Sequence, residues 1–578
     1  MNTRALTIIS TLFILLALLS PRPGPGLGEA AGERDGSGQA AHRAYAPLVT
    51  KPAAAVAPTI HSFTAAPTVI QPGGSATLLW QVSGATSLSI SPGIGPVSGG
   101  SVAVRPAATT TYTLTAANAA GSTQAKATVT VGSPPPVAKP FFLQNLDEID
   151  RATTTPTVLV DAAGGVHVAF TPQSATPDHP TRPAYYAYCP ANCAGPEAFT
   201  LVPLGDGVDF AALALTPAGR PRLLARMPVQ SGAVFVYQYW SCDANCLTPA
   251  GWASAALGYG YARQTGWVEP FVHSFALDAS GRPRFVYYDN GQDYEDPHTG
   301  AFFAWCDGGC LDPANWFETK VLDDGDATDF HLGYGATGGP RLAYVTYDNE
   351  NMLQQVAYAE CDQNCGATGN WSGSILADTV SSSVESWATL SLAVTSAGRP
   401  RIALYSGTGL GGSLPPNGLY YLACDAASCA GVSAWLGTKL NLPEMRGEDG
   451  VALALDGQNR PRIAYHAPMT AGFGLHYAWC DANCAGSAAA WSSAEVEPSE
   501  AANAELPIPP WPGCSFPQCN PPVPPCTIST WDVGLHPSLA LDGAGNARVA
   551  YDAFHQQGGG CGTFTDAKLV RFAGFFRP

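Results

Sequence analysis

The stretch Cys480-Asp481-Ala482-Asn483-Cys484 is one copy of a motif that recurs along this chain. In each copy three or four residues separate two cysteines, an aromatic residue precedes the first cysteine by three positions, and another follows the second by six or seven. The other copies contain the pairs Cys189 and Cys193, Cys242 and Cys246, Cys306 and Cys310, Cys361 and Cys365, and Cys424 and Cys429. A motif that returns at a nearly constant period indicates an array of similar structural units.

A turn with the sequence Asp456-Gly457-Gln458-Asn459-Arg460-Pro461-Arg462 precedes this motif and joins two predicted strands. Further strands end at each cysteine pair and begin near each following aromatic residue, so every unit has four strands. Seven such units predict an all-β fold, a seven-bladed β-propeller over residues 138–578. The matching turns carry Pro221-Arg222, Pro283-Arg284, Pro340-Arg341 and Pro400-Arg401, with Val166-His167 and Ala547-Arg548 as divergent ends.

The seventh unit is short of one strand. Its third strand is predicted around residues 568–572, and the sequence given ends soon afterwards. A free strand edge there would invite aggregation. The apolar residues 141–146 stand alone before the first unit, and we therefore predict that they supply the missing outer strand and close the ring.

The chain before the propeller divides into three parts. Residues 1–28 have Arg4 followed by an apolar run, as in a signal peptide. Residues 29–57 are rich in Gly, Ala and Pro and are predicted to be a flexible linker. Residues 58–132 alternate between apolar and polar positions with Gly, Pro and Ser turns, which predicts a small β-sandwich with Trp80 in its core.

Composition limits the partners and the compartment. The net charge is −17 and 13% of the 578 residues are charged. Nucleic-acid binding requires clustered Lys and Arg, so nucleic acid is not expected as a partner. Sixteen cysteines favour an oxidising compartment. No later stretch approaches the roughly 20 apolar residues of a membrane span, so we expect a secreted, extracellular protein, released or associated with the cell surface.

The cysteine pairs are interpreted as disulfides within single loops. Zinc is the alternative ligand of paired thiolates, but each pair lies on a different unit and no His recurs beside it. A Pro-rich insertion at 497–527 carries the other cysteines except Cys561, and we favour pairing Cys514 with Cys519 and Cys526 with Cys561. This stapled loop is expected over the mouth of the propeller channel, as a lid, a partner site or a covering.

Two recurring residues have both a structural and a functional interpretation. The Trp after each cysteine pair is expected to pack near the sulfurs, with a ligand platform as the alternative. The Arg after each turn proline is expected to form an ion pair with the preceding Asp of its hairpin, namely Asp278, Asp456 or Asp542. The alternative, a set of arginines that clamps a carboxylate, is less favoured because propellers usually bind ligands at the other face.

That other face carries the candidate ligand-binding residues. An acidic residue precedes the first strand in most units, and further polar residues follow the second strands. The ring could hold Ca²⁺ through carboxylate oxygens, or a sugar backed by Trp267, Trp387 and Trp531. The alternative is that these residues are solvated loop ends. The candidates are Asp209, Glu269, Asp329, Glu385, Asp449 and Asp532 before first strands, and Asp289, Asp348 and His466 after second strands.

Two segments resemble known families. The stretch from Gly73 to Trp80 and the phrase Thr109-Thr110-Thr111-Tyr112-Thr113-Leu114 resemble bacterial Ig-like domains, which implies a spacer or adhesive module. The segment from Ser538 to Tyr551 resembles the repeats of secreted propellers grouped near sialidases and fucose-binding lectins. The turns lack the Trp of the sialidase Asp box, and no catalytic residue is transferred to this chain.

The sequence leaves three functions open. The first is a secreted binding or adhesion protein whose propeller recognises a glycan or a protein. The second is an exo-acting glycoside hydrolase or lyase of sialidase-like type, in which two carboxylates serve as acid and base. The third is a structural cell-surface module. The sequence contains no recognisable nucleophile, phosphate loop or complete metal motif, which favours a binding protein over an enzyme.

Overall fold

The structure is a computed structural model that describes residues 56–575 with gaps. The gaps are 67–68, 71–74, 107–108, 132–138, 144–152, 173–183, 191–192, 206–207, 209, 230–233, 262–272, 290–299, 323–326, 337, 349–352, 382–388, 407–417, 444–449, 470–472, 516–518 and 520. The predicted signal peptide and nearly all of the predicted linker therefore lie outside the described residues.

The N-terminal strands form two sheets around one core. Trp80 and Leu78 of one sheet are buried with Tyr112, Leu114 and Val129 of the other. Side chains alternate between buried and less buried along β3, as the period of two predicts. The placement of Trp80 in the core is confirmed. The first sheet contains β1 (Thr59–Ala66), β3 (Ala76–Ser83) and β6 (Ser101–Val104); the second contains β2 (Val69–Ile70), β8 (Gly121–Val131), β7 (Thr110–Asn118), β4 (Ser87–Ser91) and β5 (Gly95–Val97).

The described part of the remaining chain forms seven four-stranded antiparallel sheets, as the repeat predicts. We number them one to seven in the order of their innermost strands. Sheet one contains β10 (Thr153–Val160), β11 (Val166–Pro172), β12 (Ala184–Cys189) and β13 (Thr200–Leu204). Sheet two contains β14 (Phe210–Leu215), β15 (Pro221–Val229), β16 (Val234–Ser241) and β17 (Ala253–Tyr261). Sheet three contains β18 (Phe275–Leu277), β19 (Pro283–Asp289), β20 (Gly300–Cys306) and β21 (Trp316–Leu322).

The later sheets repeat the same order. Sheet four contains β22 (Thr328–Gly333), β23 (Arg341–Asp348), β24 (Leu353–Glu360) and β25 (Ser372–Ser381). Sheet five contains β26 (Thr389–Val394), β27 (Pro400–Ser406), β28 (Gly418–Cys424) and β29 (Trp435–Lys439). Sheet six contains β30 (Val451–Leu455), β31 (Pro461–Pro468), β32 (Phe473–Cys480) and β33 (Trp491–Pro498). Sheet seven contains β34 (Ile528–Leu541), β35 (Ala547–Gly558), β36 (Phe564–Phe575) and β9 (Phe141–Phe142).

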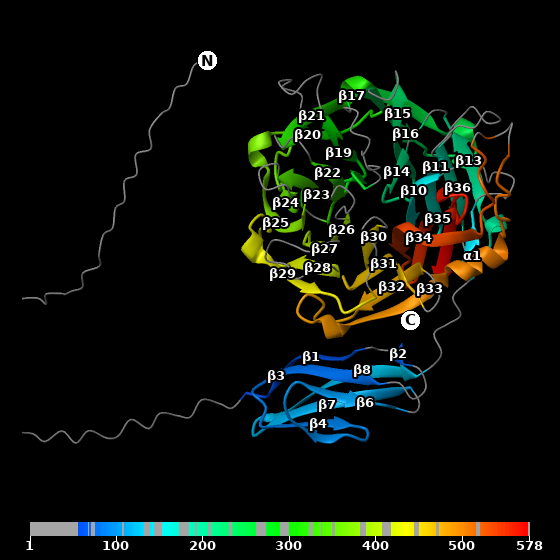
Figure 1. The fold of residues 1–578 in the computed structure, drawn as a ribbon. Coiled ribbons are helices and arrows are strands. Elements are labelled where there is room, and N and C mark those ends of the chain that lie inside the picture. The colour runs from blue at the N-terminus through cyan, green and yellow to red at the C-terminus, as the bar shows by residue number, and fades with distance from the viewer. Residues whose placement is uncertain are drawn as a thin grey trace, which may run out of the picture. The chain divides into compact units, whose positions relative to one another are not determined.

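The sheets are arranged as blades around a ring (Figure 1). Each innermost strand lies beside the innermost strand of the next sheet, and β34 of the last sheet lies beside β10 of the first. Four antiparallel strands per sheet and a closed ring of innermost strands are the defining features of a β-propeller. The sequence prediction of this architecture is therefore confirmed.

The ring is closed by strands from both ends of the propeller. Phe141 and Phe142 of β9 pair with Phe572 and Arg571 of β36, and the Leu143 N–H donates to the Val570 carbonyl at 2.9 Å. The Arg571 guanidinium is buried beneath this contact, where it binds Glu497 and Glu505 and lies 4.1 Å from the Phe142 ring centre. The predicted closing strand is confirmed at 141–142, and residues 144–146 lie outside the described residues.

The cysteine loops are closed by disulfides and cover strand edges. In five of them the Trp indole N–H donates to the carbonyl of the second cysteine, at 2.8 to 3.0 Å. The short turn after a cysteine pair lies against the outer strand of the preceding sheet, where the Thr368 hydroxyl donates to the Lys320 carbonyl at 2.6 Å. This contact protects an edge that would otherwise be free for pairing.

All sixteen cysteines lie in the described part of the chain and form eight disulfides. The six loop pairs form as predicted, and so do the favoured pairs Cys514–Cys519 and Cys526–Cys561. Disulfides at this density are typical of an oxidising compartment. Among the described helices, none has the length and apolar character needed to cross a bilayer.

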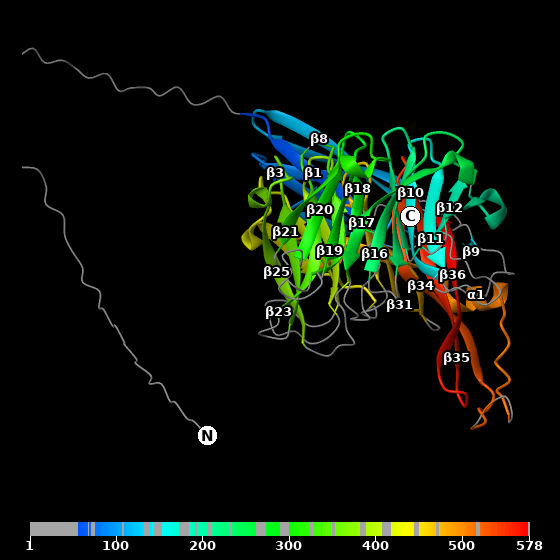
Figure 2. The same ribbon diagram turned by 90° about the horizontal axis from the view of Figure 1, so that it is seen from above.

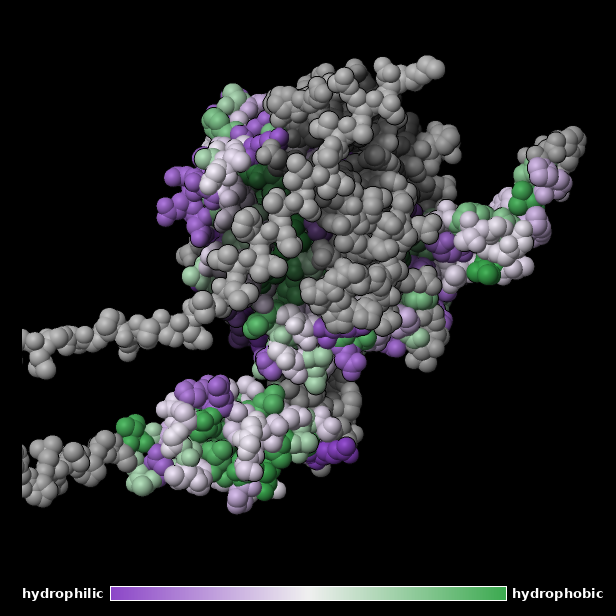
Figure 3. All heavy atoms as spheres, turned by 60° about the vertical axis from the view of Figure 1, so that its left-hand side comes forward, coloured by the Kyte–Doolittle hydropathy of each residue, from purple (hydrophilic) through white to green (hydrophobic). Residues whose placement is uncertain are grey.

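Sheet seven extends into an arm that projects beyond the ring (Figures 2 and 3). The described residues of the segment 499–527, which begins with α1 (Ser499–Glu505), lie along the lengthened strands. The Trp511 N–H donates to Gln557 at 3.1 Å, and the Trp531 indole donates to the Leu506 carbonyl at 2.8 Å. The expectation of a loop over the channel mouth is therefore wrong for these residues, because the segment covers the apolar face that the long strands of sheet seven expose.

Candidate functional site

The predicted acidic mouth is only partly within the described residues. Asp209, Glu269, Glu385 and Asp449 lie outside them, as do Trp267 and Trp387. Asp348 ends β23, and its side chain is also outside the described set. The structure therefore places four of the predicted ligand residues: Asp289, Asp329, His466 and Asp532.

Asp329 connects two blades. Its backbone is left-handed, with φ of 48°. One carboxylate oxygen pairs with His331 Nε2 at 3.1 Å, and the other accepts the Leu390 N–H of β26 at 3.3 Å. His331 in turn stacks on His273 with ring centres 4.4 Å apart. Burial, and then the proximity of His331, holds the pKa of His273 well below its usual value. Both oxygens of Asp329 are therefore engaged within the protein.

Of the other placed mouth residues, two are buried and Asp532 is 24% exposed. His466 is fully buried, and its Nε2 lies 2.9 Å from the Asp532 carboxylate. Asp289 is 7% exposed. Trp531, expected as a sugar platform, is 1% exposed and packs on Phe142 with ring centres 5.0 Å apart. The platform interpretation of Trp531 is wrong, because the segment 499–527 covers this indole.

Metal binding has no support in the described part of the chain. There, no three His, Cys, Asp or Glu side chains come together as a metal site requires. Asp329 and Asp532 are each bonded to an imidazole, and Asp329 also to a backbone N–H group, so these carboxylates do not form an assembled ligand set for the proposed Ca²⁺ ring.

A groove of about 620 Å³ lies elsewhere, between sheets two and three. It is formed by cysteine loops and hairpin turns, at the opposite end of the strands from the predicted mouth. Its volume falls within the range of small-molecule sites, about 300 to 1,000 Å³. The groove is lined by Arg222, Tyr239, Ser241, Asp243, Gly281, Arg282, Pro283, Asp307, Gly308, Gly309, Cys310, Leu311, Asp312 and Asn315.

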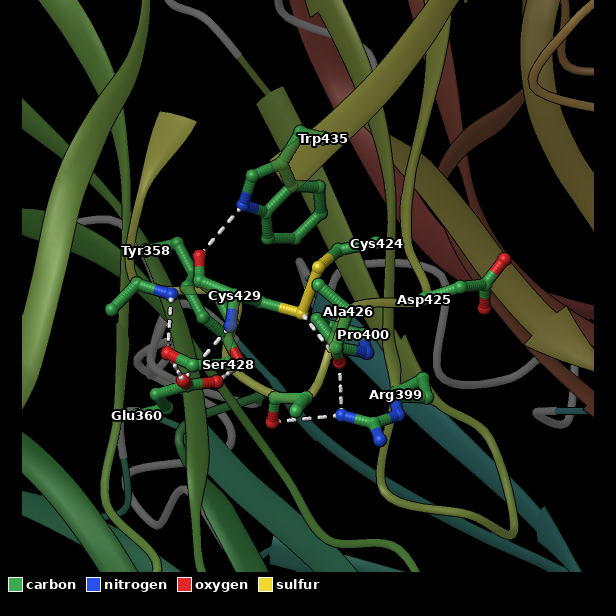
Figure 4. The surroundings of a disulfide bond; sticks show 12 residues. Tyr358, Glu360, Arg399, Pro400, Cys424, Asp425, Ala426, Ser428, Cys429 and Trp435 are labelled. Carbon is green, nitrogen blue, oxygen red and sulfur yellow. Dashed lines mark hydrogen bonds between the residues drawn. A yellow bond between two sulfur atoms is a disulfide. The ribbon is translucent and has the colours of Figure 1, made fainter. Parts of the chain in front are cut away.

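One wall is open because the residue before the first cysteine of sheet two is small. This residue is Ser241, whereas sheet three has Trp305 and sheet four has Glu360 at the same position. Trp305 lies against the next loop so closely that a Cβ added to Gly366 would be 2.7 Å from its ring. Glu360 reaches the next loop too, where it accepts the Cys429 N–H at 2.9 Å and the Ser428 hydroxyl at 2.7 Å (Figure 4). Ser241 is too short to fill its junction in this way.

The opposite wall is open because the loop of sheet three carries two glycines. Gly309 has φ of 65°, a conformation that Asn245, Asn364 and Asn483 adopt in other loops. A Cβ added to Gly308 would meet nothing within 4 Å. A Cβ added to Gly309 would meet Asn315 Nδ2 at 2.7 Å, so the free space along this backbone wall lies at Gly308.

The most exposed charged groups of the groove are carboxylates. The Asp243 side chain is 74% exposed and lies 2.7 Å from Arg222, which is 12% exposed. Asp307 is 58% exposed and lies 2.6 Å from the buried Arg284 and 3.1 Å from Arg282. Burial raises the pKa of Tyr239, so its hydroxyl is neutral at physiological pH. The site can accept hydrogen bonds at several fixed points.

The arginine prediction is confirmed and extended. Arg284, Arg462 and Arg548 bind the predicted turn acids Asp278, Asp456 and Asp542 at 2.9, 2.9 and 3.1 Å. A second set of partners was not predicted, although it recurs in the sequence directly after the first cysteine. These residues are Asp243, Asp307, Asp362, Asp425 and Asp481.

Neither a protein-family model nor a curated protein matches the chain. Solved structures of low similarity include an α-L-arabinanase of Penicillium chrysogenum complexed with arabinobiose, with 11% identity over 76% of this chain and 99% of that chain and a TM-score of 0.38. The β-propeller domain of the Trilobed protease from Pyrococcus furiosus has 9% identity over 73% and 96%, with a TM-score of 0.34. An α-L-arabinofuranosidase of Fusarium graminearum, in complex with arabinobiose, has 11% identity over 76% and 98%, with a TM-score of 0.35. Such values carry no argument about function, and the assignment as a seven-bladed propeller rests on the sheet order.

Proposed function

We propose that this protein is a secreted, extracellular binding protein whose propeller recognises a glycan in the groove between sheets two and three. The observation that carries the proposal is the open junction itself. Ser241 and the Gly308 to Gly309 backbone leave space at a position that Trp305 and Glu360 fill in the next two junctions. Exposed carboxylates at this position supply fixed hydrogen-bond acceptors for hydroxyl groups.

The rest of the chain fits an extracellular role in this proposal. Residues 1–28 act as a signal peptide, and residues 58–132 form an Ig-like module that serves as a spacer before the propeller. The eight disulfides support an oxidising location. A protein ligand in place of a glycan is the alternative within the same class.

A glycan array with the full-length protein tests the proposal. Gly308→Leu adds a side chain at a lining residue where a Cβ would meet nothing within 4 Å, and Ser241→Trp copies the filler of the neighbouring junction. We expect each variant to reduce binding by more than tenfold. Gly457→Leu is the matched control, because a Cβ at Gly457 also meets nothing within 4 Å but lies in another blade. Glycan binding that survives both groove variants would place the ligand elsewhere.

The acidic ring at the other end of the blades remains a prediction. It concerns Asp209, Glu269, Asp329, Glu385, Asp449 and Asp532, with Ca²⁺ as the candidate cation. The same array repeated with a chelator and with Asp532→Asn tests this ring. Loss of glycan binding in both experiments, with no effect of Gly308→Leu, would move the proposed site to the mouth.

An exo-acting hydrolase or lyase is the second candidate. Carboxylate–imidazole pairs favour it, namely His331 with Asp329 at 3.1 Å, His466 with Asp532 at 2.9 Å and His536 with Asp552 at 3.0 Å. His536 also has a left-handed backbone, with φ of 43°, and such strain in a residue other than glycine is often found at functional sites. Release of sugars from an oligosaccharide by the wild type but not by His536→Gln would favour this candidate. Neither binding nor release would leave the structural cell-surface module.

A further inference from the structure

The charges of the groove are arranged asymmetrically with respect to solvent. Three acids, Asp243, Asp307 and Asp312, and two bases, Arg222 and Arg282, line it. The Asp243 and Asp307 side chains are 74% and 58% exposed, whereas Arg222 is 12% and Arg282 is 44% exposed. An approaching ligand therefore meets carboxylate oxygens before it meets guanidinium groups.

The arginine donors are directed into the protein. Arg222 donates through Nη1 to the carbonyls of Pro221 and Cys242 at 3.0 and 2.9 Å, and through Nη2 to Asp243. Arg282 donates through Nε to Asp278 at 2.7 Å and pairs with Asp307. A site for a carboxylate or sulfate ligand usually offers the fork of an arginine to the anion. Here the donors of both arginines are engaged by groups of the hairpin turns and cysteine loops.

From this arrangement, and resting on the proposed function, we infer that the groove selects neutral sugars and rejects acidic ones. Adjacent hydroxyls of a sugar ring donate to the exposed oxygens of Asp243 and Asp307. The apolar face of the ring lies on the Gly308 to Gly309 backbone and beside Leu311, which is 46% exposed. A uronic, sialic or sulfated sugar would bring a second negative charge next to these carboxylates, and like charges brought together in a binding site disfavour association.

A cationic peptide is the main competing ligand for exposed carboxylates. Asp243 and Asp307 each already have an arginine partner, at 2.7 and 2.6 Å. A lysine or arginine side chain would have to share these oxygens with the arginine already bonded to them, whereas a sugar hydroxyl needs only one of their remaining lone pairs. This combination favours hydroxyl donors over a lysine or arginine side chain.

The test compares neutral, acidic and basic probes on the full-length protein. The probes are mannose-, galactose- and glucose-terminated oligosaccharides, their sialylated, uronic and sulfated counterparts, and a lysine-rich peptide. Affinities are measured by isothermal titration calorimetry for the wild type and for Asp243→Asn. The matched control is Asp425→Asn, which changes the equivalent carboxylate of sheet five, 76% exposed and bonded to Arg401, outside the groove.

We expect at least one neutral probe to bind, with about a tenfold loss of affinity in Asp243→Asn and no change in Asp425→Asn. Binding of acidic probes that is sensitive to Gly308→Leu would overturn the selectivity and leave the proposed function intact. Binding of the peptide alone would overturn both the selectivity and the glycan class. Neutral-glycan binding that is insensitive to Gly308→Leu, or no binding of any probe, would overturn the selectivity and the proposed site together.

Discussion

The junction between sheets two and three and the junction between sheets four and five share one framework but differ at their surface. Both have the arginine after the turn proline, the disulfide-closed loop and the indole bonded to the second cysteine. In the second junction Glu360 bridges to Ser428 and Cys429, whereas in the first Ser241 leaves a groove. The repeat therefore determines the blade, and single side chains between blades determine where a ligand has room.

The ion pairs of the shared framework can be removed at its most buried arginine. Arg462 is 1% exposed and binds Asp456 and Asp481 at 2.9 and 2.8 Å. Arg462→Ala leaves both carboxylates without this cation, and we expect it to lower the free energy of unfolding by about 3 to 5 kcal/mol. Arg222→Ala, next to the exposed Asp243, should cost only about 1 kcal/mol. Denaturant titration measures the free energy of unfolding of both variants. Equal losses of stability would contradict the view that burial makes the Arg462 ion pairs more important than that of Arg222.

The filler of a closed junction can be removed. Trp305→Ser gives the junction between sheets three and four the small residue that Ser241 provides one blade earlier. We expect a loss of about 2 kcal/mol in the free energy of unfolding, since Trp305 is only partly buried. We also expect a second groove, seen as a rise in the stoichiometry of glycan binding. If the stoichiometry stays unchanged, the small side chain alone does not create a site.

The loop that bears the glycine wall can be released. Replacing Cys306 and Cys310 together by Ala removes the constraint on a very short loop, which the chain-entropy model values at about 2 kcal/mol or slightly less. Glycan affinity should fall as well, because the wall formed by Gly308 and Gly309 is no longer held. The same change at Cys480 and Cys484 is the control: it should lower stability to a similar extent but leave glycan affinity unaltered.

Acid should weaken the framework gradually. Burial acts to raise the pKa of Asp456, but hydrogen bonds from the Arg460 and Gln458 N–H groups and the charge of Arg462 lower it below its usual value. A carboxyl whose pKa is lower in the folded than in the unfolded state stabilises the fold above about pH 4, and this contribution is lost as the pH falls through the folded-state pKa. The wild type should therefore lose stability in acid more steeply than Asp456→Asn, as shown by thermal unfolding at several pH values. If the stability of both proteins fell equally with pH, the lowered pKa of Asp456 would be contradicted.

The sequence was sufficient for features that repeat and insufficient for contacts between units. The blade count, the loop disulfides, the hairpin ion pairs and the closing strand at Phe141 and Phe142 all followed from periodicity and pairing rules. The contacts of Asp329 could not be predicted in this way, because its partner Leu390 belongs to the next blade. The burial of Trp531 could not be predicted from the repeat, because the segment that covers it is an insertion without a counterpart in other units.

The groove was visible in the sequence only as two departures from the repeat. Ser241 stands where four other units carry Tyr188, Trp305, Glu360 or Trp479 and sheet five carries Ala423, and Gly308 and Gly309 replace bulkier loop residues. These departures indicate a groove only because both positions face the same junction. That fact is known only once the arrangement of neighbouring blades is known. Departures from a strong repeat are therefore the positions at which to look for function in such a chain.

A crystal structure of the full-length protein with the tightest-binding neutral oligosaccharide would show directly whether the groove between sheets two and three is the glycan site. We expect a sugar ring between sheets two and three, with hydroxyls on Asp243 and Asp307 and an apolar face on the Gly308 to Gly309 backbone. A sugar bound at the opposite end of the blades, near Asp329 or Asp532, with this groove empty, would contradict it.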